Sequence, residues 1–146
     1  MNPLIKKLAF KGHPSVYILQ SPDSFQDTIK EWESLAPVHT SLNNPGEIDF
    51  LLAFVTQQAE LDALIEQIEG RLAGDTTIWF CYPKGSSKKY KSSINRDQGW
   101  DRMIPLEVEK VSLVAIDQDW SALRFRKIAY IKSIKRAESR KLHPLS

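Results

Sequence analysis

The residues best suited to chemistry stand together directly after an apolar run. The run Ile78–Tyr82 is followed by Pro83 and then by Lys84-Gly85-Ser86-Ser87. Glycine lets backbone N–H groups turn toward an anion, lysine supplies positive charge, and serine hydroxyls donate hydrogen bonds. This combination suits a phosphate group or a nucleic-acid backbone. The G-x-x-x-x-G-K-[ST] spacing of a P-loop is absent, and a solvated surface loop is the alternative.

Four further side chains could complete a ligand site around this stretch. Arg96 and Arg124 could add contacts to an anion, or could make surface ion pairs. Asp117 could act as a base or pair with Lys84, but its position at the start of a short turn favours capping of that turn. Trp120 could stack on a ligand, and a core position is the alternative. The sequence assigns a catalytic role to none of them.

The other reactive residue types form no recognisable site. His13, His39 and His143 are far apart, so we expect no metal site. Neither a G-x-S-x-G elbow nor a G-x-G-x-x-G loop is present, and no cofactor is predicted. The single cysteine, Cys81, lies among aromatic residues, which favours an inert buried thiol. A lone cysteine excludes an internal disulfide and favours a reducing compartment, so we expect a cytoplasmic protein.

The pattern of apolar residues predicts the elements that must position these side chains. Almost continuously apolar runs such as Ile48–Val55 are typical of strands buried on both faces of a parallel sheet. Apolar residues at helical spacing, such as Phe25, Ile29 and Trp32, predict helices between the runs. Strands are expected at 16–19, 38–42, 48–55, 76–82, 111–116 and 122–128, and helices at 23–36, between Thr56 and Gly74, and at 95–103.

This alternation predicts an α/β domain of three layers. A mostly parallel central sheet of about five strands is flanked by helices, with an antiparallel edge hairpin near the C-terminus. Residues 1–131 form the single domain, and residues 132–146 form a basic tail. The predicted core consists of Val16, Ile18, Phe25, Ile29, Trp32, Leu51, Ala53, Leu64, Ile68, Ile78, Phe80, Leu113, Val114 and Phe125.

Composition and charge narrow the class of protein further. The chain has 146 residues, 42% of them hydrophobic and 26% charged, which is typical of a globular domain and excludes collagen-like and disordered chains. No apolar stretch is long enough for a membrane span or a signal peptide, so no membrane partner is predicted. Residues 124–146 carry eight Lys or Arg residues against one acidic residue. Such a basic end is either a solvated tail or a contact with nucleic acid.

The predicted sheet indicates where these side chains meet. In open α/β sheets, ligands bind outside the carboxyl ends of the strands. The candidate ligand-binding residues are therefore Lys84, Gly85, Ser86, Ser87, Arg96, Asp117, Trp120 and Arg124. Lys89 and Lys91 are expected farther out on the loop, where they matter less.

Several segments of the sequence resemble a known family. The stretch 78–87, the residues Ile94-Asn95-Arg96-Asp97 with Trp100, and the segment 114–125 are similar to small bacterial proteins known as domain of unknown function 3052. Leu19-Gln20-Ser21-Pro22 and the unit at 48–68 also resemble that family. The resemblance covers roughly residues 8–128. It implies a bacterial, cytoplasmic single domain and supplies no activity.

The residues favour one function over two others. The favoured function is a non-enzymatic module that binds a small anionic or phosphorylated ligand at the carboxyl end of the sheet. Binding of nucleic acid or another anionic partner through the lysine-rich loop and the basic tail is an alternative. An enzyme that uses Lys84 and Asp117 is another. The sequence names neither the ligand nor the oligomeric state.

Overall fold

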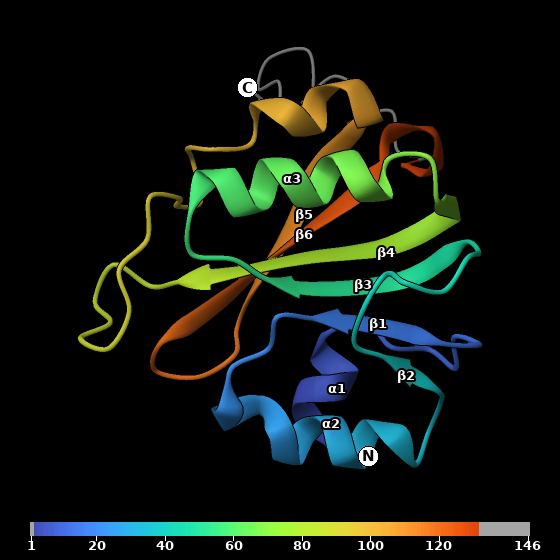
Figure 1. Cartoon of the computed structure of the whole chain (residues 1–146), viewed down its shortest axis with the longest axis horizontal. Helices are drawn as coiled ribbons and strands as arrows, with labels where there is room; N and C mark the ends of the chain where they lie inside the picture. Colours follow the sequence, from blue (N-terminus) through green and yellow to red (C-terminus); the bar gives the residue numbers. More distant parts are fainter. Residues whose placement is uncertain (1, 132–146) are drawn as a thin grey trace.

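The computed structural model describes residues 2–131, and the predicted basic tail at 132–146 lies outside this part. Six strands form one sheet, which helices join and cover (Figure 1). The strands are β1 (Val16–Leu19), β2 (Val38–His39), β3 (Ile48–Phe54), β4 (Leu72–Pro83), β5 (Val108–Ala115) and β6 (Trp120–Lys127). The helices are α1 (Pro3–Lys7), α2 (Gln26–Glu33) and α3 (Gln58–Ile68), with 3-10 turns η1 (Asp23–Phe25), η2 (Asp101–Leu106) and η3 (Ile128–Tyr130).

The sheet has the strand order β2-β1-β3-β4-β6-β5. The pairs β2–β1, β1–β3 and β3–β4 are parallel, and β6 runs antiparallel to both β4 and β5. This confirms the predicted α/β fold with a mostly parallel sheet and a C-terminal antiparallel hairpin, although the sheet has six strands rather than about five. The chain moves from β1 to β2 in one direction and from β3 to β4 in the other. The switch point of the sheet therefore lies between β1 and β3.

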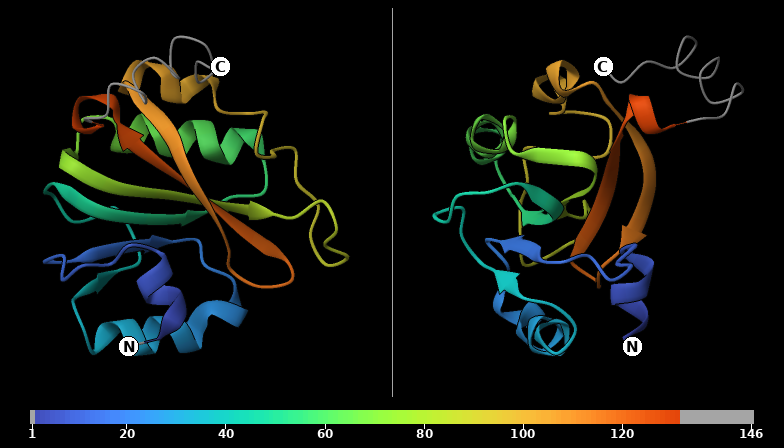
Figure 2. Two further views of the ribbon diagram at one scale, coloured as in Figure 1. Left: turned by 180° about the vertical axis from the view of Figure 1, so that it is seen from behind. Right: turned by 90° about the vertical axis from the view of Figure 1, so that its right-hand side faces the viewer.

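Each of the central strands contributes to two separate apolar clusters. In β4, Ile78 and Phe80 belong to the cluster that includes the apolar residues of α3, whereas Trp79 and Cys81 belong to the cluster that includes those of α1 and α2. Figure 2 shows α3 on one side of these strands and α1 with α2 on the other. Burial on both faces explains why the central strands have no alternation of apolar and polar residues.

The predicted core is buried except on β5. Leu113 is 48% exposed, and Val114 is only partly buried. Because β5 forms the edge of the sheet, Leu113 has a neighbouring strand on one side only. An apolar strand pattern does not distinguish an edge from an interior position.

The structure adds a short N-terminal helix that the sequence analysis missed. In α1 the side chain of Asn2 accepts a hydrogen bond from the backbone N–H of Leu4 at 2.7 Å, which caps the helix. Ile5 and Leu8 are fully buried, and the indole N–H of Trp79 donates to the carbonyl oxygen of Leu8 at 2.7 Å. A helix of five residues is too short to show a periodic pattern.

The predicted helix at 95–103 is wrong. The side-chain oxygen of Asn95 accepts hydrogen bonds from the backbone N–H groups of Asp97 and Gln98 at 2.8 and 2.9 Å, which forms a local turn instead. Gly99 then has a φ of 107°, a conformation that favours glycine. The only helical residues of this region are those of η2, which begins at Asp101.

Cys81 is expected to be unreactive in the native protein. Its side chain has no exposed surface, and burial raises the pKa of its thiol well above the usual value, with a further contribution from Asp117. A neutral thiol without access to solvent is a poor nucleophile. Ellman titration should label Cys81 only after denaturant is added. Stoichiometric labelling within seconds in native buffer would contradict its buried position.

Candidate functional site

The segment 84–93, here called the lysine loop, is held at its start by the turn between β5 and β6. The backbone N–H of Lys84 donates to the carbonyl oxygen of Asp119 at 2.8 Å. The hydroxyl of Ser87 donates to the carboxylate of Asp119, also at 2.8 Å. The ring of Tyr90 packs on Trp120, with 4.9 Å between the centroids. These three contacts fix the first half of the loop against the end of the sheet.

The far end of the lysine loop is held by the start of α3. The backbone N–H of Ser93 donates to the carbonyl oxygen of Thr56 at 3.0 Å. The hydroxyl of Ser93 accepts a hydrogen bond from the backbone N–H of Gln58 at 2.9 Å. The loop therefore connects the carboxyl ends of β3 and β4 with the β5–β6 turn.

A pocket of about 550 Å³ lies between the lysine loop and the carboxyl end of β4. Its volume falls in the range of roughly 300–1,000 Å³ that is typical of small-molecule sites. It is here called the lysine-loop pocket, and it is lined by Tyr82, Pro83, Lys84, Gly85, Ser87, Tyr90, Lys91, Ser92, Ser93, Ile94, Asn95 and Gln98.

The pocket brings together part of the predicted site. Lys84, Gly85 and Ser87 line it, whereas Ser86 is exposed and does not. Lys91 lines it as well, contrary to the expectation that it lies farther out. The chain turns back after Ser87 and returns to α3, and sequence spacing does not reveal this return.

The other four predicted residues lie outside the pocket lining. The carboxylate of Asp117 accepts hydrogen bonds from the backbone N–H groups of Asp119 and Trp120, so it caps the β5–β6 turn. Trp120 is 3% exposed and belongs to the core. Arg96 is exposed and pairs with its neighbour Asp97. Arg124 lies opposite the mid-strand residue Trp79 of β4, and burial lowers the pKa of its guanidinium group.

Three polar residues of the lining lie outside the lysine loop and were not among the predicted site residues. Tyr82 is 5% exposed, and burial raises the pKa of its hydroxyl, which therefore stays protonated at neutral pH and can donate a hydrogen bond. The side chains of Asn95 and Gln98 are hydrogen-bonded to each other at 3.3 Å. Tyr82 was assigned to a buried strand and the other two to a helix, and neither assignment indicated a pocket.

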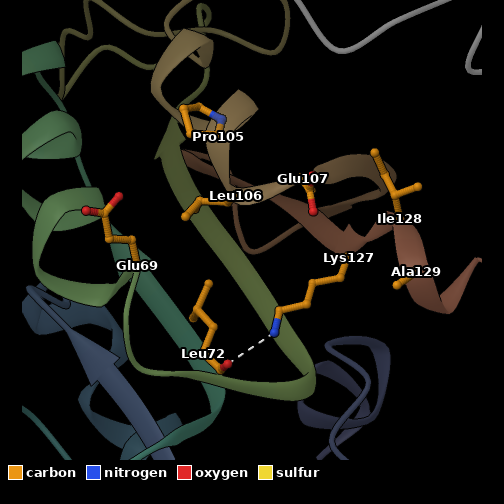
Figure 3. Close-up of a pocket in the computed structure, with 8 residues that line it drawn as sticks. All are labelled: Glu69, Leu72, Pro105, Leu106, Glu107, Lys127, Ile128 and Ala129. Atoms are coloured by element: carbon orange, nitrogen blue, oxygen red, sulfur yellow. Dashed lines mark hydrogen bonds between the residues drawn. The ribbon is translucent and has the colours of Figure 1, made fainter.

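A second pocket, of about 530 Å³, lies at the opposite end of β4. It is lined by Glu69, Leu72, Pro105, Leu106, Glu107, Lys127, Ile128 and Ala129. Figure 3 shows the ammonium group of Lys127 reaching the carbonyl oxygen of Leu72, at 3.1 Å. Because β4 begins at Leu72, this pocket lies at the amino end of a parallel strand, away from the edge where α/β sheets bind ligands.

The described part of the chain has neither a candidate metal-ion site nor a candidate membrane-spanning helix. Residues 2–131 contain no group of three or more His, Cys, Asp or Glu side chains that could hold a metal ion. None of the helices in this part has the length and apolar character that spanning a bilayer requires.

The fold is similar to that of solved methyltransferase structures. A SAM dependent methyltransferase from Aquifex aeolicus has a TM-score of 0.57 at 8% identity, over 86% of this chain and 88% of that chain. The pyocyanin biosynthetic protein PhzM has a TM-score of 0.56 at 10% identity, over 85% of this chain and 53% of PhzM, so this chain spans about half of it. A protein of the NADB-Rossmann superfamily from Streptococcus agalactiae has a TM-score of 0.52 at 10% identity, over 87% of this chain and 68% of that chain. At these identities the likeness shows a Rossmann-like fold.

The sequence matches no protein-family model, and none of the curated proteins matches it. The resemblance to domain of unknown function 3052 therefore stays a prediction.

The structural neighbours correct the function expected from the sequence. We expected a non-enzymatic module for binding small anions, and the residues inclined us against enzymatic activity. Solved structures that share this fold include methyltransferases, which are enzymes, so this expectation is wrong. A surface loop rich in lysine and serine indicates a place for a ligand, but it does not distinguish binding from catalysis.

S-adenosylmethionine, the cofactor that the neighbours imply, does not fit the first strand–helix turn of this chain. In Rossmann-like folds this turn carries glycines, and an acidic residue about 20 positions later binds the ribose. Here the turn is Gln20-Ser21-Pro22-Asp23, and the next strand ends at His39, which Thr40 follows. The hollow beside these residues measures about 150 Å³, below the range of roughly 300–1,000 Å³ for small-molecule sites.

Proposed function

We propose that this chain is an enzyme with a methyltransferase-like fold and that its substrate binds in the lysine-loop pocket. One observation carries the proposal: in a sheet with this fold, the pocket lies outside the carboxyl end of a central strand, β4, where α/β enzymes place their ligands. The loop beside the pocket is tied at its start to the β5–β6 turn and at its far end to the start of α3. A substrate would therefore meet side chains that are already in position.

The polar lining supports a small substrate rich in hydrogen-bond acceptors. Burial raises the pKa of the Tyr82 hydroxyl, which can donate a hydrogen bond, and the ammonium groups of Lys84 and Lys91 can only donate. We assign to the Tyr82 hydroxyl the donation of a hydrogen bond to the substrate, and to the two lysines the orientation of its acceptor atoms. Asp117 has no part in this proposal, because its carboxylate caps a turn.

The proposal also covers the domain organisation of the chain. Two apolar clusters, one with α3 and one with α1 and α2, support three layers around a single sheet. We infer that residues 1–131 act as one cytoplasmic domain related to domain of unknown function 3052.

Metabolite profiling tests the proposed function. The purified full chain is incubated with a bacterial metabolite extract, and mass spectrometry follows which compounds are consumed and formed. We expect at least one compound to be converted, with a rate that falls about tenfold or more in Lys84→Ala and in Tyr82→Phe. Loss of one positioned donor typically costs this much in catalysis.

Lys88→Ala is the matched control for this experiment. Lys88 belongs to the same loop and carries the same charge, but it is exposed and does not line the pocket. Its variant should convert the compound at the wild-type rate. No conversion by the wild type, or equal conversion by Lys84→Ala, would refute the proposal.

A further inference from the structure

Two side chains next to the switch point, those of Gln20 and Glu60, form hydrogen bonds within the chain. Gln20, the first residue after β1, has a φ of 56°, in the left-handed region that favours glycine. A glutamine thus stands in a turn where Rossmann folds carry glycine, which allows close approach of a ligand. The side-chain amide of Gln20 satisfies its neighbours in the orientation that places its nitrogen next to Phe54. In this orientation the nitrogen donates to the carbonyl oxygen of Phe54 and to the carboxylate of Glu60, both at 3.2 Å.

The carboxylate of Glu60 also occupies the N-terminus of α3. One of its oxygens accepts hydrogen bonds from the backbone N–H and the hydroxyl of Thr56, at 3.0 and 2.9 Å, and from the backbone N–H of Gln57, at 3.0 Å. Burial acts to raise the pKa of Glu60, but these bonds outweigh it, and the net effect lowers the pKa. The side chain is therefore an anion at neutral pH, in the place where helix N-termini bind anionic ligands.

The next N–H group of the helix has a partner as well. The backbone N–H of Gln58 donates to the hydroxyl of Ser93, which belongs to the lysine loop. The backbone N–H groups of Thr56, Gln57 and Gln58 are thus all satisfied within the chain. A ligand that binds these N–H groups would have to displace Glu60 or Ser93 from them.

We propose that Glu60 and Gln20 close the switch-point crevice, with the Glu60 carboxylate standing in for the anionic group of a ligand. This chain then holds neither S-adenosylmethionine nor a dinucleotide there. The ribose of such a ligand would also lack its usual acidic binding residue, because residues 39–41 at the end of β2 include no acidic side chain. The inference goes beyond the proposed function, and either can fail without the other.

Binding followed by NMR tests the closure directly. The ¹⁵N-labelled wild-type chain is titrated with S-adenosylmethionine and, separately, with NAD⁺, each to about 1 mM, a concentration that would reveal even weak binding. We expect the amide signals of Gln20, Ser21, Thr56 and Gln57 to stay unchanged. Saturable shifts of these signals would overturn the proposal. Shifts confined to the lysine loop would support it, because the ligand would then bind away from the switch point.

Hydrogen exchange tests the role of the Glu60 carboxylate. In Glu60→Ala, the amide protons of Thr56 and Gln57 should exchange about fivefold faster than in the wild type, because each loses one hydrogen bond. Glu60→Gln keeps an acceptor and should restore part of the protection. Glu66→Ala, which changes an exposed carboxylate on the same helix, should leave both amides unchanged. Equal exchange in Glu60→Ala and the wild type would also overturn the proposal.

Discussion

Replacing Phe80 by alanine is expected to lower the free energy of unfolding by about 3–5 kcal/mol. Phe80 has no exposed surface, and its ring lies in the middle of the cluster beneath α3, 5.9 Å from the ring of Trp100 and 6.1 Å from that of Phe125. The substitution removes most of the buried side chain, and its rigid neighbours cannot collapse into the cavity. Urea unfolding followed by tryptophan fluorescence measures the loss.

Two variants calibrate this result. Phe80→Leu keeps most of the volume and should cost less than half as much as the alanine variant. Leu35→Ala changes a side chain that is 42% exposed, and it should cost less than about 1 kcal/mol. A loss below about 1 kcal/mol in Phe80→Ala would show that the ring is not in a packed core.

Replacing Arg71 by alanine is expected to cost about 2–3 kcal/mol, because hydrogen bonds from a charged group are among the stronger ones. The guanidinium group donates to the carbonyl oxygens of Gly46, Asn44 and Leu42, at 2.8, 2.8 and 3.1 Å. It also lies over the ring of Tyr17, 5.6 Å from the centroid. This one side chain thus holds the segment before β3 against the start of β4.

The matched control for Arg71 is Arg102→Ala. The side chain of Arg102 is 55% exposed and forms an ion pair with the exposed Glu66 at 3.9 Å, so its loss should cost less than about 0.5 kcal/mol. Arg71→Lys keeps the charge but lacks the planar fork that reaches several carbonyl groups, and it should recover less than half of the loss. Equal stabilities of Arg71→Ala and Arg102→Ala would contradict this role of Arg71.

The apolar pattern predicted the fold class because a strand that is buried on both faces consists mostly of apolar residues, without alternation. The runs at 48–55 and 76–82 are mostly apolar, and they became the adjacent central strands β3 and β4. The short turn at Asp117 predicted the antiparallel hairpin, since a few residues can only reverse the chain. The position of Lys84 after β4 likewise placed it at the edge of the sheet, in the lining of a pocket.

The order of the strands and the return of the lysine loop were decided only by the tertiary structure. The position of β5 at the edge exposes Leu113, although its apolar side chain suits a core. Lys91 reaches the pocket because Ser93 is bonded to α3, a contact between residues 35 positions apart. The closure of the switch point depends on the hydrogen bond between Gln20, which follows β1, and Glu60, which lies in α3. Local propensity and spacing describe near neighbours in the chain, whereas these contacts depend on which strands pair, and strand pairing is set by the packing of the whole domain.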